Sequence, residues 1–275
     1  MSADFSEFIK TEDALFHYTK AATVINEILP TMKLKLSLFK DTNDPREYKE
    51  RFFGFIGFSY LPSVREAKKL SKKINQIIRN EYRVACFCSN YPPIMILENR
   101  KDLEDPHATR EGWNKSRMWS QYGDNHAGAC VVFSKRSLKE IFSHECTSDQ
   151  LYSYERVSYL QNYEIHHESL TLNGDRLANE GEEKYLKDFI SSNFDHIYFE
   201  KHIDYRDEAE YRVVIHDPLS KLETINIKAA LKGVIWGDKI SEVVLPCLHE
   251  ECNRLSIDCI HLKWEQGRPL ALRCV

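Results

Sequence analysis

Side chains able to carry out chemistry are densest in residues 205–215, where a charged segment runs directly into a short β-branched run. Such a pattern predicts a loop that leads into a strand. Because side chains alternate along a strand, Glu208, Glu210 and Arg212 are expected to project from one face and Tyr211 from the other. Two carboxylates beside a guanidinium can orient one reactant and activate a second. The simpler alternative is an ion pair between Arg212 and a glutamate at a solvated sheet edge.

Two further groups of side chains are awkward to explain as hydrophobic core. The first is residues 17–19, with the sequence His-Tyr-Thr, in an expected strand at 14–19. The second is Trp119 and Tyr122, which share one face of an expected short helix. The alternatives remain open, because His17 can be a hydrogen-bonded strand histidine and the two aromatic residues can be the core stripe of their helix.

Several common catalytic motifs are absent from the sequence. It contains no G-x-x-x-x-G-K, no G-x-G-x-x-G after a strand, no H-E-x-x-H and no G-x-S-x-G. Cys86 and Cys88 alternate with apolar residues, which favours core thiols over nucleophiles. The group Cys247, His249, Cys252 and Cys259 leaves structural zinc as an alternative to buried thiols, but we expect no metal.

The composition indicates an ordinary globular protein of the cytoplasm. The chain has 275 residues, 29% charged and 42% hydrophobic, with a net charge of −4. This charge argues against a general nucleic-acid coat but leaves room for a local basic patch. Eight cysteines without a C-x-x-C pair suit a reducing compartment. No apolar run of transmembrane length and no secretory signal are found, so we expect a cytoplasmic protein that does not contact a membrane.

Hydrophobic periodicity predicts strands and helices that do not alternate strictly, which indicates an α+β fold in a single domain spanning residues 1–275. We expect strands at 14–19, 34–38, 82–88, 130–133, 151–160, 210–215, 222–227, 233–237, 259–264 and 270–274, and helices at 24–29, 64–80, 118–122, 137–144, 182–199 and 246–255. A helical insertion at about 60–80, a long loop at 89–110 and a helix-strand-strand unit at 241–275 accompany the core. The loop has the length of a lid or specificity loop.

The helix expected at 64–80 carries a row of lysines and arginines on its outer face. Such a row is either a solvated surface or a contact for an acidic partner such as nucleic acid. No aromatic residue is interleaved with the charges to support base stacking.

Residues 43–47, with the sequence Asn-Asp-Pro-Arg-Glu, predict the start of a helix. Asp44 is a good N-cap, Pro45 suits the first helical position, and Glu47 lies where a capping-box carboxylate belongs. Asn43 lies just outside the cap and has less to do structurally, which keeps it among the candidates for ligand binding.

A set of short motifs occurs in a fixed order along the chain: His17-Tyr18-Thr19, Asn43-Asp44-Pro45-x-Glu47, Cys86-Phe87-x-Ser89, Met118-Trp119-x-x-Tyr122, His126-x-Gly128, Lys201, Glu208-x-Glu210-Tyr211-Arg212 and the glycine-bounded residues 233–237. Over about residues 14–240 this set resembles the bacterial family catalogued as domain of unknown function 2971. Tyr205 departs from the pattern, where a tryptophan is expected, but an aromatic residue is kept.

The order His, Tyr, Glu is also similar to the His–Tyr–Glu class of ADP-ribosyltransferases. This resemblance implies a central mixed or antiparallel split sheet flanked by helices, with NAD as the substrate. His17 would hold the ribose of NAD, Tyr122 would stack on the nicotinamide, and Glu210 would bind the ribose 2′-hydroxyl. Glu208 would be the second carboxylate of a Glu-x-Glu pair. The remaining binding candidates are Tyr18, Thr19, Asn43, Ser89, Trp119 and Arg212.

The expected function is therefore NAD-dependent ADP-ribosyl transfer to a protein or nucleic acid, in a bacterial toxin or antiphage-defence effector that a regulatory or antitoxin partner could restrain. An ionised carboxylate beside the sugar would stabilise the positive charge that develops when the nicotinamide–ribose bond breaks. Two alternatives are kept: an NAD glycohydrolase on the same scaffold, and a non-catalytic nucleotide-sensing or partner-binding module.

Overall fold

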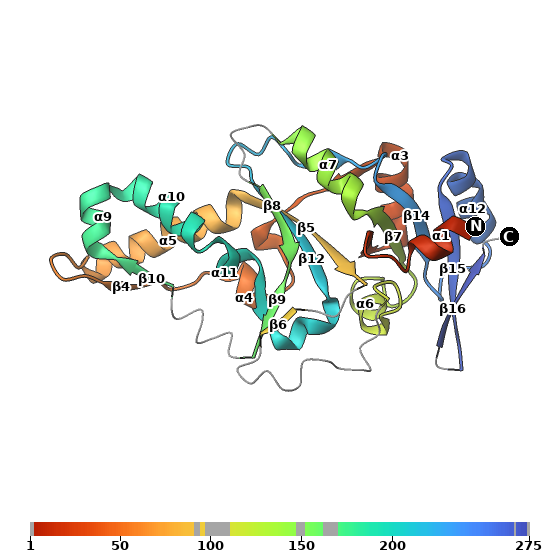
Figure 1. The fold of residues 1–275 in the computed structure, drawn as a ribbon, viewed down its shortest axis with the longest axis horizontal. Coiled ribbons are helices and arrows are strands. Elements are labelled where there is room, and N and C mark those ends of the chain that lie inside the picture. The colour runs from red at the N-terminus through yellow and green to blue at the C-terminus, as the bar shows by residue number, and fades with distance from the viewer. Residues whose placement is uncertain are drawn as a thin grey trace.

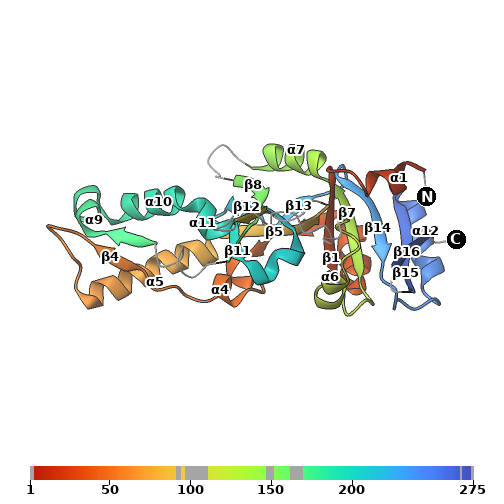
Figure 2. The same ribbon diagram turned by 60° about the horizontal axis from the view of Figure 1, so that its bottom comes forward.

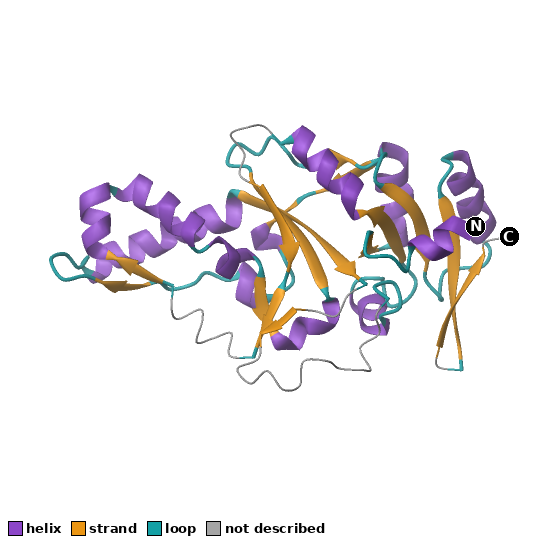
Figure 3. Cartoon of the chain, viewed as in Figure 1, coloured by secondary structure: helices purple, strands orange, loops and turns teal. Residues whose placement is uncertain are grey.

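The computed structural model of the chain describes residues 3–90, 94–96, 111–146, 152–161, 170–266 and 268–273. These residues form an α+β structure built on a mixed sheet with helices around it, as expected from the sequence (Figures 1 and 3). A long arm containing α5, α9 and α10 projects from one end of the sheet, and α12 lies at the other end (Figures 1 and 2).

The central sheet has nine strands in the described part of the chain. Their order is β16 (Arg268–Arg273), β15 (Asp258–Glu265), β14 (Leu231–Trp236), β7 (Ala129–Ser134), β1 (Ala14–Thr19), β5 (Tyr82–Ser89), β12 (Glu210–His216) and β8 (Tyr152–Arg156), with β3 (Ser37–Leu38) beside β5. Only β14 and β15 run parallel among these neighbours. The sheet is therefore mixed but mainly antiparallel.

The sheet opens between β1 and β5. These strands pair only at Leu15–Ser89 and Phe16–Cys88, whereas β1 pairs along its whole length with β7 on its other side. Further along the same edge of β5, β3 pairs at Val84. The segment 85–87 is thus unpaired on this edge although both of its ends are paired, and this opening positions the site described below.

Three small sheets accompany the central sheet in the part of the chain that the structure describes. They are β11 (Glu200–His202) with β9 (Ser158–Leu160) and β6 (Ile94–Ile96), β10 (Thr171–Asn173) with β4 (Gly54–Ile56), and β13 (Thr224–Asn226) with β2 (Lys33–Lys35). The pair of β10 and β4 lies in the projecting arm (Figure 1).

The helical segments are α1 (Ala3–Phe8), α2 (Ala21–Thr23), η1 (Val24–Ile28), α3 (Leu29–Thr31), η2 (Phe39–Asp41), α4 (Pro45–Tyr48), α5 (Val64–Asn80), α6 (Ser116–Gln121), α7 (Lys135–Glu145), α9 (Gly174–Glu180), α10 (Glu182–Ser192), α11 (Phe194–Tyr198), η4 (Ile203–Glu208) and α12 (Leu245–Arg254). The longest, α5, starts with a capping box in which Ser63 and Glu66 satisfy each other's backbone amides. None of the helices in the described residues is long and apolar enough to cross a membrane.

Hydrophobic residues pack on both faces of the central sheet. On one face, alternate residues of β12 such as Tyr211 and Val213 join a single large cluster with residues of β1, β7 and β14. On the other face the core is divided, because Val214 packs with the helices of the arm and Phe16 packs with α1 and α6. The polar residues of the site lie where these two clusters part.

Three expected elements differ from the structure. Residues 151–160, expected as one strand, form β8 and β9 separated by Val157, and the two pieces pair with different sheets. Residues 34–38, expected as one strand, form β2 and β3 separated by Leu36, and the two pieces pair with different sheets. The helix expected at 182–199 ends at Ser192 and restarts at Phe194, because the side chain of Asn193 donates to the carbonyl of Phe189 and terminates the first segment. Most of the expected loop at 89–110 lies outside the described residues.

A buried ion pair secures β5 to the segment that follows β12. Nε of Arg83 donates to Oδ2 of Asp217 at 2.8 Å, and Asp217 also accepts from the backbone amides of Lys221 and Leu222. The same guanidinium contacts Glu223, whose side chain is 70% exposed.

We predict that Asp217→Asn lowers the free energy of unfolding by about 3 kcal/mol, because the buried guanidinium of Arg83 loses its ionised partner. Glu223→Gln, which removes an exposed partner of the same guanidinium, is the matched control and should change the free energy by less than about 1 kcal/mol. Urea unfolding at pH 7 measures both, and equal losses would show that burial does not decide the strength of this pair.

Candidate functional site

A cleft of about 190 Å³ lies at the opening between β1 and β5. Its walls come from β1, from β5, from the β2–α4 segment, from the end of α6 and from the segment that enters β12. The lining residues are Phe16, His17, Tyr18, Lys35, Ser37, Asp41, Thr42, Asn43, Glu47, residues 84–88, Met118, Tyr122, Lys201, Glu208, Glu210 and Arg212. The predicted residues His17, Tyr122, Glu208 and Glu210 are thus brought to one cleft from distant parts of the chain.

The floor of the cleft is a buried guanidinium. Arg212 has no exposed surface, and its Nε and Nη2 atoms donate to Oε1 and Oε2 of Glu210 at 2.7 and 3.0 Å. Nη1 donates to the carbonyl of Tyr198 at 2.6 Å, and Nη2 lies 2.9 Å from Oε1 of Glu47. The expected ion pair between Arg212 and a glutamate therefore exists, but it is bidentate and buried instead of lying at a solvated edge.

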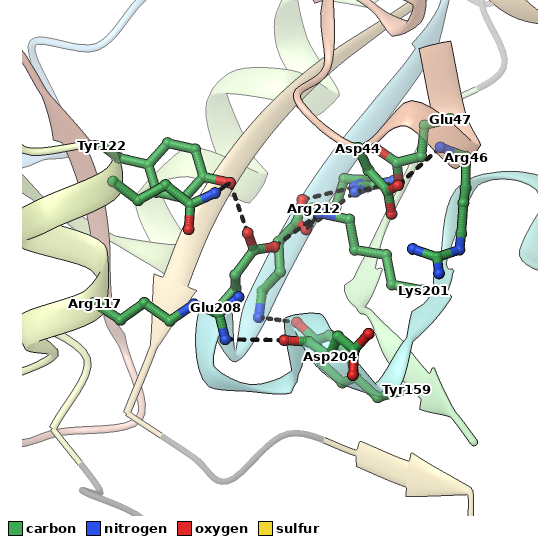
Figure 4. Close-up of polar contacts among 12 residues, drawn as sticks. Asp44, Arg46, Glu47, Arg117, Tyr122, Tyr159, Lys201, Asp204, Glu208 and Arg212 are labelled. Atoms are coloured by element: carbon green, nitrogen blue, oxygen red, sulfur yellow. Dashed lines mark hydrogen bonds and ion pairs between the residues drawn. The ribbon is translucent and has the colours of Figure 1, made fainter. Parts of the chain in front are cut away.

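Lys201 connects the two glutamates of the Glu-x-Glu pair, and Figure 4 shows it beside Glu208. Its Nζ atom lies 2.8 Å from Oε2 of Glu208 and 2.8 Å from Oε2 of Glu210, and the side chain is buried. The hydroxyl of Tyr122 donates to Oε1 of Glu208 at 2.6 Å. We refer to Glu47, Lys201, Glu208, Glu210 and Arg212 as the charge cluster.

Glu208 reaches the cluster by a different route from the one that strand alternation predicts. It ends the 3₁₀ segment η4, and β12 begins only at Glu210. The intervening Ala209 adopts a left-handed conformation with φ of 41°. The turn rather than the pleat brings Glu208 beside Glu210, so the expectation that both carboxylates project from one extended strand is wrong.

The two glutamates have opposite electrostatic environments. Burial alone would raise the pKa of Glu210, but the guanidinium of Arg212 and the ammonium of Lys201 outweigh burial and hold that pKa far below its ordinary value. Burial raises the pKa of Glu208, and the opposing effects of Lys201 and of the Tyr122 hydroxyl do not cancel it. Glu210 is therefore held in its ionised form, whereas the carboxylate of Glu208 lies closer to protonation.

An excess of carboxylates explains this inequality. The charge cluster has three carboxylates and two cations, and Asp44 lies close enough to Glu47 and Lys201 for their charges to act on it. Burial raises the pKa of Asp44 as well. Because the carboxylates outnumber the cations, ionising all of them would leave a buried negative charge without a partner. Such a charge is poorly solvated, so burial raises the pKa of the carboxylates with fewer cationic partners.

Glu47 does not close a capping box. Asp44 caps α4 as expected, because its Oδ1 accepts from the amide of Arg46 at 2.8 Å. The side-chain oxygens of Glu47 make no hydrogen bond within the described residues, and the contact with Arg212 is an ion pair without hydrogen-bond geometry. The pull of the buried guanidinium overrides the local capping signal, so the expected capping role of Glu47 is wrong.

His17 lies on β1, on the other wall of the cleft, and contacts the unpaired segment of β5. Its Nδ1 atom is 3.0 Å from the carbonyl oxygen of Cys86, in the unpaired segment of β5. A carbonyl can only accept, so Nδ1 carries a proton. Burial lowers the pKa of His17, against a smaller raising effect of this hydrogen bond. The ring is therefore neutral with Nε2 as an acceptor, and within the described chain it has no hydrogen bond or ion pair with either glutamate.

Tyr122 is held at the end of α6 by contacts between that helix and the turn that carries Glu208. Nζ of Lys115 donates to the carbonyl of Asp207 at 3.1 Å, and Nη1 of Arg117 donates to the carbonyl of Asp204 at 2.9 Å. These two bonds fix η4 relative to α6. The phenol ring and the carboxylate thus approach each other as parts of two connected elements.

Not every predicted binding residue reaches the cleft. Trp119 is completely buried, donates to the carbonyl of Trp113 and packs edge-on against Tyr18 at 5.0 Å, so its role is in the core. Ser89 is buried, and its hydroxyl donates to the carbonyl of Ala209, which fastens β5 to the turn before β12. Thr19 is not among the lining residues.

The other binding candidates do lie at the cleft. Tyr18 lines it, but its hydroxyl is committed to the carbonyl of Gly112 at 2.6 Å. Asn43 is exposed at the rim. Arg212 lies at the floor, where its three nitrogen atoms are all occupied, so it can act on a ligand only through its neighbours.

The cysteines near the cleft are thiols of the core and not nucleophiles. Burial raises the pKa of Cys86, whose side chain contacts Glu210, and burial raises the pKa of Cys88 to about 12. The group that left zinc as an alternative does not assemble, because Cys252 and Cys259 are buried in the hydrophobic core whereas Cys247 is exposed. No group of metal-ligating side chains is found among the described residues.

Sequence reasoning did not assign roles to Lys201 or to the buried face of Glu47. Both residues belong to the ordered motifs of the sequence, so their place in that order was the available signal. Sequence spacing did not predict these contacts. Lys201 pairs with Glu208 across a turn, and Glu47 pairs with Arg212, on a strand more than 160 positions away.

Residues 118–213 match the sequence profile of a family described as Protein of unknown function (DUF2971). The matched segment is about a third of the chain and contains Tyr122, Lys201, Glu208, Glu210 and Arg212. It supports the first resemblance on those residues. No curated protein and no solved structure matches the chain. The resemblance to ADP-ribosyltransferases therefore stays a prediction.

We predict that Glu210→Gln lowers the free energy of unfolding at pH 7 by about 3 to 5 kcal/mol, because Arg212 and Lys201 lose a buried counter-ion. The folded pKa of Glu210 is lower than its ordinary 4.5, so its stabilising contribution is present above that pH and is lost as the pH falls toward the folded value. The difference between wild type and variant should accordingly shrink below about pH 4.5. Urea titrations between pH 3 and 8 measure it, and a variant as stable as wild type at pH 7 would contradict the structural role of Glu210.

Proposed function

We propose that this protein cleaves the bond between nicotinamide and ribose in NAD and transfers the ADP-ribosyl group to a macromolecular acceptor. The observation that carries the proposal is the hydrogen bond from Tyr122 to Glu208 at the cleft, 2.6 Å long, on a carboxylate whose pKa burial raises. A carboxylate of this kind is suited to accept a proton, and Glu210 beside it supplies a fixed negative charge.

The reaction separates these two tasks. When the bond from the ribose carbon to the nicotinamide nitrogen breaks, its electron pair stays with nitrogen, nicotinamide leaves neutral and the ribose becomes positively charged. The ionised carboxylate of Glu210 stabilises that charge. A nucleophilic oxygen or nitrogen of the acceptor then bonds to the ribose carbon, and Glu208 takes the proton that the acceptor releases.

This assignment differs from the one that the resemblance implies. Both oxygens of Glu210 already accept hydrogen bonds from Arg212 or Lys201, so a ribose 2′-hydroxyl would have to share them with charged partners. We therefore give the reactive role to Glu208 and regard Glu210 as a positioning residue. Tyr122 orients Glu208 through its hydroxyl while its ring can face the nicotinamide.

The dimensions of the cleft suit the reacting end of the dinucleotide. A volume of about 190 Å³ is smaller than the roughly 300 Å³ at which pockets for whole small ligands begin. The nicotinamide and its ribose would enter, and the adenosine half would lie outside. The neutral ring of His17, with Nε2 as acceptor, is available for a ribose hydroxyl.

A second candidate, a non-catalytic nucleotide-sensing module, is favoured by the saturation of the charge cluster. All four carboxylate oxygens of Glu208 and Glu210 already accept hydrogen bonds from protein groups, as in an assembly that binds without turnover. An NAD glycohydrolase would use the same groups with water as acceptor. The roles of toxin or antiphage effector, and of an antitoxin partner, rest on the resemblance alone.

We predict that Glu208→Gln slows NAD consumption by at least about 100-fold, because an amide cannot take up the acceptor's proton. Asp204→Asn, in the same turn with a side chain 67% exposed, is the matched control and should stay within about twofold of wild type. Nicotinamide release in the presence of a cell lysate measures both variants, and a Glu208→Gln variant as active as the control would remove Glu208 from the mechanism.

NAD labelled in its adenylate half distinguishes the candidates in the same assay. Label in macromolecules indicates a transferase, and free ADP-ribose alone indicates a glycohydrolase. Binding of NAD by calorimetry without any nicotinamide release would contradict both and leave the sensing module.

A further inference from the structure

The projecting arm carries a row of unpaired cations along α5. Arg65, Lys68, Lys69 and Lys72 are exposed, lie within one arc of the helix and make no hydrogen bond or ion pair with the rest of the described chain. Their neighbour Lys73 is different, because its Nζ atom lies 2.6 Å from Glu182 of α10. Four free cations therefore follow one edge of the arm, and no described residue of this protein neutralises them.

The geometry of the row fits a linear polyanion. At a rise of about 1.5 Å per residue, the cations span about 10 Å along the helix axis. The axis of α5 runs along the arm (Figures 1 and 2). The row thus follows the arm lengthwise, whereas a ring of cations around its end would suit insertion into a lipid surface. A nucleic-acid strand presents phosphates at regular intervals along such a line.

At the outer end of the row, a tightly held loop displays apolar side chains. Asp175 accepts hydrogen bonds from the backbone amides of Phe58, Ser59 and Tyr60 at 2.7, 2.8 and 2.7 Å. A Cβ atom on Gly57 would lie 2.3 Å from the carbonyl oxygen of Tyr60, so only glycine permits this closure. The loop is therefore built for one conformation, although it covers no core.

That conformation exposes aromatic rings just before the start of the helix that carries the cations. Phe58 is completely exposed and Tyr60 is 36% exposed, with Leu61 and Val64 beside them at 59% and 74%. The sequence of the helix itself contains no interleaved aromatic residue, but the fold brings these two rings to its start. Aromatic faces beside a line of cations are the combination with which proteins hold unpaired bases and their phosphates.

The row also leads toward the cleft. α5 ends at Asn80, and β5 begins at Tyr82 and lines the cleft with residues 84–88. A nucleic-acid strand that lies along α5 from the loop at 57–63 is thus directed toward the wall of the cleft.

We propose that α5 and the loop at 57–63 form a binding surface for single-stranded nucleic acid, which is the acceptor presented to the cleft. The cations Arg65, Lys68, Lys69 and Lys72 hold phosphates, and Phe58 and Tyr60 stack on bases. A duplex would leave the rings without exposed base faces, so the surface prefers single strands. The binding stands on the arm alone, whereas the role as acceptor rests on the proposed function.

The test measures fluorescence anisotropy of labelled single-stranded RNA and DNA oligonucleotides with the full-length protein, without NAD. Lys68→Glu/Lys72→Glu should weaken binding at least tenfold at 100 mM salt and reduce the slope of log K against log salt by about 1.4, since each phosphate contact on a single strand contributes about 0.7. Phe58→Ser should weaken binding about fivefold or more through lost stacking.

Lys184→Glu/Lys187→Glu, on exposed positions of α10, makes the same change of charge elsewhere on the arm and should stay within about twofold of wild type. Equal losses from the two double variants would reduce the effect to general electrostatics and overturn the inference. Absence of oligonucleotide binding, or recruitment only to vesicles containing anionic lipid, would also overturn it.

The inference and the proposed function can fail separately. If oligonucleotides bind as expected but NAD is not consumed, the surface stands and the enzyme assignment falls. If NAD is consumed and label reaches only protein, while Lys68→Glu/Lys72→Glu transfers as well as wild type, the acceptor role of the surface falls and the chemistry stands.

Discussion

The burial of one guanidinium, that of Arg212, constrains the rest of the site. Arginine cannot lose its proton in a protein, so a fully buried Arg212 must be matched by anions and carbonyl groups. Its partners come from β12 itself, from α4 and from the end of α11. Elements distant in the sequence are therefore fixed around the mouth of one strand, and the cleft is the space left above them.

The same interaction gives two neighbouring carboxylates opposite pKa shifts. Glu210 is bound by the guanidinium of Arg212, which lowers its pKa and keeps it ionised. Glu208, two residues earlier, has only Lys201 and Tyr122 as side-chain partners among the described residues, and burial raises its pKa. Two carboxylates with opposite pKa shifts thus arise from a single Glu-x-Glu sequence. On the opposite wall, burial keeps the ring of His17 neutral, and its hydrogen bond to the carbonyl of Cys86 places the proton on Nδ1.

Sequence reasoning reached the parts of this arrangement that local chemistry determines. The alternation in β12, the amphipathic pattern of α5 and the N-cap at Asp44 each depend on neighbouring residues, and each is present. The α+β class followed from the order of such elements. The order of the motifs also brought His17, Tyr122, Glu208 and Glu210 onto one list of candidates, and all four line the cleft.

What the sequence could not give depends on contacts between distant segments. Trp119 and Tyr122 have the same helical face and similar character, yet one is sealed in the core and the other reaches the cleft. The spacing of Glu47 from Asp44 fits a capping box, but in the structure the side chain of Glu47 pairs with the buried Arg212. The sequence around Phe58 and Tyr60 gives no sign that their rings are exposed. Their exposure depends on the hydrogen bonds between their loop and Asp175, a residue more than 100 positions away.

The most direct test of the central claim is a carbon-13 NMR titration of the glutamate side-chain carboxyls, with Glu208→Gln and Glu210→Gln spectra identifying the two signals. The account predicts that the signal of Glu208 titrates above the ordinary value of 4.5, and that the signal of Glu210 stays ionised to the lowest pH at which the protein remains folded. Two signals that titrate together near 4.5, or in the reverse order, would contradict it.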